Sequence, residues 1–138
     1  MHIRWLNVIL GALLLEAILF AVLVPIGFVN TTLFLTAVPI GCLVFGYLVT
    51  RWVLRSLRSD LPLHGALIAV LATAMYFGLV VMAPGGLSSA VATYGVPLFY
   101  FSQAMRIAGC LLGAVHLQRR VSAALPPASR AGARHEHL

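Results

Sequence analysis

The sequence predicts an all-α integral membrane protein that folds as an up-down bundle of four transmembrane helices. Of its 138 residues, 62% are hydrophobic and 9% are charged, whereas a soluble domain carries about 25% charged residues. The mean hydropathy is +1.03. Residues 5–50 contain Glu16 as their single formal charge, and residues 61–118 contain Arg106 alone. Each stretch is long enough for two spans, because one span needs about 20 apolar residues.

The limits of these apolar blocks predict where each span begins and ends. Pro25 follows the first block, and Pro84 follows the third together with two glycines, so a helix should end at each place. Pro62 suits the first turn of the third span. Residues 84–94 are expected to form an uncharged loop. The predicted bundle covers residues 1–118, with spans at about 5–24, 33–54, 63–83 and 96–117.

The arginines predict the orientation of the chain. All nine basic residues are arginine, and all but Arg106 lie before the first span, at the end of the second span and in the connection that follows it, or after the fourth. The other two connections carry no charge, so the positive-inside rule places both termini in the cytoplasm. We expect a plasma (bacterial inner) membrane, and residues 119–138 as a basic, disordered cytoplasmic tail. The arginines expected to set topology and contact lipid headgroups are Arg4, Arg51, Arg55, Arg58, Arg119 and Arg120.

The two charges inside the spans should lie at the same depth. Glu16 lies about 16 Å along its helix from Trp5, and Arg106 lies about 15 Å before His116, at about 1.5 Å per residue. Both therefore lie near the middle of a hydrocarbon core about 30 Å thick. A charge at that depth costs roughly 2.5–3.5 kcal/mol, so we expect the two to pair. The predicted intramembrane polar site comprises Glu16, Arg106, Gln103, Ser102 and Tyr76.

Small residues at helical spacing predict where helices pack closely. Gly109 and Gly113 form a GxxxG motif in the fourth span, on the face that carries the polar residues. Gly65, Ala69 and Thr73 recur at every fourth position of the third span and form a second ridge of small side chains. Either ridge is suited to a neighbouring helix of the same chain or to a helix of a partner.

Two interpretations of the charge pair follow. In the structural one, Glu16 and Arg106 form a buried ion pair that fixes helix register, with Gln103 and Tyr76 completing its hydrogen bonds. Such a pair adds little net stability, although loss of one partner is costly. In the functional one, Glu16 titrates or binds a cation, while Arg106 binds an anion or tunes the pKa of the carboxyl group. A third, less favoured outcome is that the two side chains never meet.

The sequence argues against several kinds of chemistry. It contains three acidic residues and no motif for hydrolysis or phosphoryl transfer, so a non-enzymatic role is favoured. His64 and His116 are expected to be interfacial side chains, so no metal site is predicted, and the sequence identifies no cofactor. Cys42 and Cys110 lie in different spans and are expected to be buried small hydrophobes. A nucleic-acid partner is not expected, because the basic residues follow the membrane topology.

The segment at residues 11–16, Gly-Ala-Leu-Leu-Leu-Glu, together with the number of spans, resembles the small multidrug resistance transporters. The resemblance implies a membrane-embedded glutamate in the first span of a four-span chain. The later spans lack the aromatic and glycine pattern of that family, and Arg106 is foreign to a cavity that exports cations. The resemblance therefore implies no substrate.

The function favoured by the sequence is a small accessory or stabilising subunit of a membrane assembly. Four short helices enclose little volume, which favours a homo-oligomer or a larger membrane complex within the lipid bilayer. The alternative is an oligomeric small transporter or channel in which Glu16 and Arg106 line the pathway. In that alternative Glu16 carries a proton or cation, and Arg106 binds an anion or tunes the carboxyl group.

Overall fold

The computed structural model describes residues 3–124, and over that range it consists of five α-helices without a strand. Four of the helices are long and apolar enough to cross a membrane, which supports a multi-pass membrane protein. The predicted all-α class and the four apolar spans are thus confirmed. The helices are α1 (Trp5–Val29), α2 (Thr31–Leu54), α3 (Leu61–Met82), α4 (Gly86–Tyr94) and α5 (Val96–Ala124).

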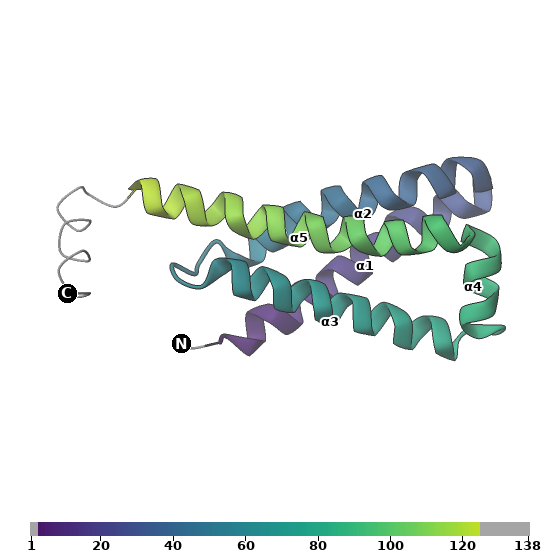
Figure 1. Ribbon diagram of the computed structural model, residues 1–138, viewed down its shortest axis with the longest axis horizontal. Helices are drawn as coiled ribbons and strands as arrows, with labels where there is room; N and C mark the ends of the chain where they lie inside the picture. The colour runs from purple at the N-terminus through teal and green to yellow at the C-terminus, as the bar shows by residue number, and fades with distance from the viewer. Residues whose placement is uncertain (1–2, 125–138) are drawn as a thin grey trace.

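The four long helices form a bundle in which α1 and α5 lie at opposite corners. Each of these two packs against α2 and α3, and α2 and α5 form the most extensive contact. The start of α1, the α2–α3 connection and the end of α5 lie at one end of the bundle (Figure 1). We call this the basic end, because it carries Arg4, Arg51, Arg55, Arg58, Arg119 and Arg120. The opposite, neutral end carries Asn30 and α4.

Glycines bring the backbones of α2 and α5 into direct contact. A Cβ atom at Gly113 would lie 2.5 Å from the carbonyl oxygen of Tyr47, and one at Gly109 would overlap the carbonyl oxygen of Leu43. Only a residue without a side chain permits this approach. The GxxxG motif of α5 is therefore occupied by α2 of the same chain.

The small residues of α3 also pack within the chain. A Cβ atom at Gly65 would lie 2.6 Å from the Cβ atom of Ala114 on α5. Ala69 is buried as well, whereas Thr73 is half-buried and its hydroxyl oxygen has no hydrogen-bond partner among the described residues. The first two positions of this ridge thus serve helix packing inside the bundle.

The first helix does not end near Pro25, so its predicted limit at residue 24 is wrong. The missing N–H of Pro25 removes one helical hydrogen bond, but membrane helices tolerate proline and α1 continues to Val29. The turn is made by Asn30 instead. Its backbone N–H donates to the Ile26 carbonyl at 2.9 Å, and its side-chain oxygen accepts from the Leu33 N–H at 2.9 Å. One residue therefore connects α1 to α2.

The loop predicted for residues 84–94 is largely helical, and that prediction is wrong. Helix α4 is bounded by Gly85 and Gly95, whose positive φ angles of 81° and 72° suit glycine. Inside it, serine and threonine hydroxyls bond back to backbone carbonyls, as Ser88 Oγ does to Gly85 at 2.7 Å. Serine and threonine also favour turns, so the composition of this segment predicted a loop where the structure has a helix.

The remaining helix limits follow the prediction more closely, except at the end of α5. Helices α2 and α3 begin and end within two residues of the predicted spans. Helix α5 continues past residue 117 to Ala124, because Arg119 and Arg120 end the apolar segment without ending the helix. The start of the predicted disordered tail is therefore helical. Residues 125–138 lie outside the described residues.

Gly109→Ala should destabilise the bundle, because the new methyl group overlaps the α2 backbone. Overpacking of this kind costs about 1–3 kcal/mol. Gly78→Ala is the matched control, since this glycine is also inside a long helix and an added Cβ meets nothing within 4 Å. Thermal unfolding in detergent should show a lower midpoint for the first variant, and an unchanged or higher one for the second. Equal midpoints would contradict the close α2–α5 contact.

Candidate functional site

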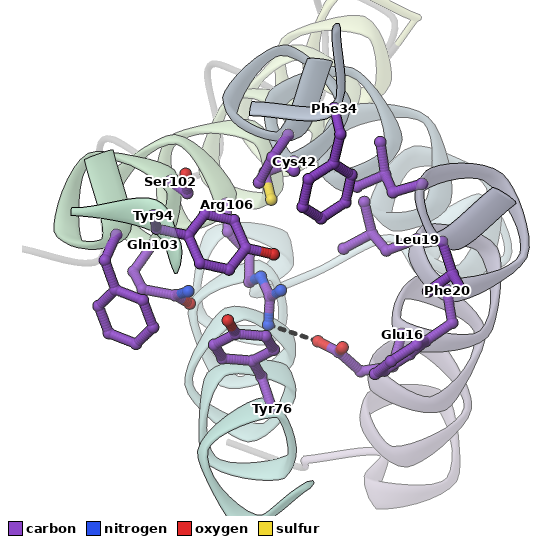
Figure 2. Close-up of a pocket in the computed structure, with 14 residues that line it drawn as sticks. Glu16, Leu19, Phe20, Phe34, Cys42, Tyr76, Tyr94, Ser102, Gln103 and Arg106 are labelled. Carbon is purple, nitrogen blue, oxygen red and sulfur yellow. Dashed lines mark hydrogen bonds and ion pairs between the residues drawn. The ribbon is translucent and has the colours of Figure 1, made fainter. Parts of the chain in front are cut away.

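The two intramembrane charges form an ion pair across the bundle. Arg106 Nη1 donates to Glu16 Oε1, and the residues are 3% and 4% exposed, respectively. Because α1 and α5 lie at opposite corners, both side chains extend into the space between the helices, where they point toward each other (Figure 2). The pair therefore lies on the inside of the bundle and not among the lipid tails.

Arg106 also contacts α3 in two ways. Its Nη1 also donates to the Ala72 carbonyl oxygen at 3.2 Å. Its guanidinium carbon lies 4.8 Å from the centroid of the Tyr76 ring, at the distance of a cation–π contact. Tyr76 thus contacts Arg106 through the face of its ring, and the predicted hydrogen bond from Tyr76 to the pair is not formed.

Two buried polar atoms beside the ion pair have no hydrogen-bond partner among residues 3–124. They are Arg106 Nε and Gln103 Oε1. Gln103 does not complete the hydrogen bonds of the pair as predicted, and Ser102 donates to the Leu98 carbonyl of its own helix at 2.8 Å. An unsatisfied buried donor or acceptor costs about 1–3 kcal/mol, so such atoms are rare in native proteins. One donor and one acceptor are therefore available to a bound molecule.

These polar groups line a partly enclosed cavity of about 70 Å³. The volume exceeds the ~10–15 Å³ that one water molecule needs. Figure 2 shows Glu16, Arg106 and Tyr76 together, with aromatic and aliphatic side chains around them. The remaining wall is formed by Leu19, Phe20, Leu23, Val24, Phe34, Val38, Cys42, Tyr94, Phe99, Ser102 and Gln103.

The cavity occupies the half of the bundle nearer the neutral end. On α1 its lining runs from Glu16 to Val24, and on α2 it runs from Cys42 back to Phe34. At this end α4 lies between the end of α3 and the start of α5 (Figure 1). Toward the basic end the glycine contacts close the bundle, and a Cβ atom at Gly46 would lie 3.2 Å from the carbonyl oxygen of Arg106. The ion pair thus forms the base of the cavity.

Aromatic rings form the wall of the cavity at the neutral end. Phe99 is 1% exposed, and its ring centroid lies 6.1 Å from Tyr76 and 6.2 Å from Tyr94. Tyr94 in turn lies 5.6 Å from Phe34 on α2. Sequence reasoning missed Phe34, Tyr94 and Phe99 as site residues. For Phe99 a signal was available, because it lies four positions before Gln103 and therefore on the same face of α5.

The histidines near the basic end are held by the chain itself. His64 Nε2 accepts from the backbone N–H of Arg4 at 3.1 Å, and Nδ1 bonds the Asp60 carbonyl oxygen at 2.8 Å. The hydrogen bond between Arg4 and His64 connects the start of α1 to the start of α3. His116 is likewise bonded through both ring nitrogens. Both rings therefore have structural partners.

Glu16→Gln and Arg106→Gln should each lower the free energy of unfolding, because each leaves one buried charge unpaired. Removing one partner of a buried pair costs about 3–5 kcal/mol. The double variant should lose less than the sum of the two, since it leaves neither charge behind. Arg58→Gln, at an exposed loop position, should stay within about 0.5 kcal/mol. Additive losses in chemical or thermal unfolding would show that the two side chains do not interact.

No protein-family model, no curated protein and no solved structure matches this chain. The likeness of residues 11–16 to the small multidrug resistance transporters gains no support from these comparisons.

Proposed function

We propose that this protein is a small non-enzymatic membrane transporter that binds a polar solute at the Glu16–Arg106 pair. The observation that carries the proposal is the position of the pair at the base of a cavity, beside a donor and an acceptor that have no partner within residues 3–124. A pair that served only to fix helix register would be surrounded by packed side chains and satisfied hydrogen bonds.

The chemistry of the lining describes the solute. Arg106 Nε offers a hydrogen bond, Gln103 Oε1 accepts one, and the Glu16 carboxylate supplies a negative charge that a proton or cation can neutralise. The rest of the wall is apolar and rich in aromatic rings. A small solute with both donor and acceptor groups and a compact apolar body would match this lining.

We infer from the positive-inside rule that the basic end, with both termini, faces the cytoplasm, and we propose that the membrane is a bacterial plasma membrane. The cavity then lies in the outer half of the bundle, and the packed half separates it from the cytoplasm. A site near the membrane midplane with free space on one side and packed helices on the other fits one state of an alternating-access carrier. Because one chain encloses only a small cavity, the pathway would be completed in a homo-oligomer.

An accessory subunit of a larger assembly remains the second candidate. The sequence offered two surfaces for a partner helix in that role: the small-residue ridge of α3 that contains Gly65, and the GxxxG motif formed by Gly109 and Gly113. These glycines pack against helices of the same chain. The accessory role therefore has less support than binding of a solute in the cavity.

The two free cysteines give a direct test of access to the cavity. Cys42 lines the cavity, whereas Cys110 is packed between helices and does not. In single-cysteine variants, 2-aminoethyl methanethiosulfonate should modify Cys42 faster than Cys110, as followed by intact-protein mass spectrometry. Faster modification of Cys42 from the periplasmic side would fit the proposed orientation. Equal resistance of the two thiols would show that the cavity is sealed.

Glu16→Gln should abolish proton-coupled solute movement, because the amide cannot exchange a proton. The assay uses proteoliposomes with a pH-sensitive dye inside and a panel of small amines, amides and carboxylates outside. Wild-type protein and Arg58→Gln should respond to the same member of the panel. Glu16→Gln, assayed at a temperature below its lowered unfolding midpoint where it is monodisperse in detergent, should not respond. If no member produces a proton movement in the wild type, the transporter proposal fails.

A further inference from the structure

A second hollow lies at the basic end, on the side of α2 that is flanked by α1 and α5. It is a shallow groove of about 750 Å³ with an almost entirely apolar floor. Its rim carries Arg51 and Trp52 from α2, Arg55 directly after α2, and Arg120 from α5. It shares no lining residue with the cavity above the ion pair. The floor is formed by Leu14, Ile18, Leu48, Val49 and Leu117.

No acidic side chain within residues 3–124 balances the three arginines of the rim. Among residues 3–124 the acidic side chains are Glu16 and Asp60, and Glu16 is paired with Arg106. No arginine of the rim forms an ion pair with a described residue. Three positive charges beside an apolar floor call for an anion that carries an apolar body.

Hydrogen bonds hold two of these arginines in place across α2 and α5. Arg120 Nε donates to His116 Nε2 at 3.0 Å, so that nitrogen is an acceptor and Nδ1 carries the proton of the neutral ring. Nδ1 then donates to the Tyr47 hydroxyl at 3.2 Å, which also accepts from Arg51 Nη1 at 3.3 Å. The chain Arg120–His116–Tyr47–Arg51 thus fixes the spacing of two guanidinium groups and leaves most of their N–H groups free.

The third arginine is placed by the aromatic residue of the rim. The Arg55 guanidinium carbon lies 5.1 Å from the ring centroid of Trp52. Trp52 is half-exposed, and tryptophan is enriched where the hydrocarbon core meets the headgroups. The rim therefore lies at the depth of lipid phosphates, while the floor extends toward the acyl chains.

We propose that this groove binds one anionic phospholipid. Its phosphate is held by Arg51, Arg55 and Arg120, and an acyl chain lies along the apolar floor at Leu14 and Ile18. The proposal is independent of the solute site, because the two hollows share none of their described lining residues. A soluble phosphate would match the rim but would leave the floor uncovered, so a lipid is the better occupant.

Trp52 reports directly on this site when Trp5 is replaced by phenylalanine. The protein is placed in phosphatidylcholine nanodiscs that contain increasing amounts of phosphatidylglycerol brominated on its acyl chains. Fluorescence should be quenched at lower mole fractions by this lipid than by equally brominated phosphatidylcholine. Arg51→Gln, Arg55→Gln and Arg120→Gln should each weaken the apparent affinity about fivefold, the equivalent of about 1 kcal/mol per basic residue.

Controls separate a discrete site from general attraction of the basic end for anionic lipid. Arg58→Gln removes an exposed arginine that does not line the groove, and Arg55→Lys keeps the charge, so both should bind nearly as the wild type does. Equal quenching by the two lipids, or an equal loss in Arg58→Gln, would overturn the proposal. Displacement of the lipid by millimolar glycerol 3-phosphate would also overturn it, because the site would then be one for a soluble anion.

Discussion

Contact between one carboxylate and one guanidinium group constrains the whole bundle. Glu16 and Arg106 come from helices at opposite corners, so α2 and α3 must lie close enough to both corners for the two side chains to meet. The glycines of α3 and α5 provide that closeness by letting backbones touch. Either charge alone would be costly at this depth in a bilayer. Because the two charges are paired, the four-helix fold can contain both Glu16 and Arg106 at this depth.

The packing differs between the two halves of the molecule, and because of this difference the ion pair borders free space on one side. Toward the basic end, small residues exclude free space between α2, α3 and α5. Toward the neutral end, α4 lies between α3 and α5, and the space between the helices is bounded by aromatic rings. The pair lies at the boundary, where its polar atoms meet a hollow. At that boundary, Arg106 Nε and Gln103 Oε1 have no hydrogen-bond partner in the described part of the chain.

Much of the fold followed from hydropathy, because insertion into a bilayer depends on the length and polarity of each segment. Equal helical rise from the two interfaces predicted that Glu16 and Arg106 share a depth, and helical phase placed Gln103 on the same face. The order of the helices around the bundle was not predictable, because hydropathy does not indicate which helices pack against one another. Helix α4 was missed because its small polar residues also favour turns. The contact of Tyr76 through its ring depends on the rotation of α3, which its sequence alone does not specify.

The two connections at the neutral end differ in length, and this difference restricts how the molecule can change shape. Asn30 alone joins α1 to α2, and glycines bring the backbones of α2 and α5 into contact, so these three helices form one closely connected block. The far half of α3 is attached to that block through the nine residues of α4. A change in the volume of the cavity would therefore be accommodated more readily by this half of α3, whose buried residues end at Ala72, than by α1, α2 or α5.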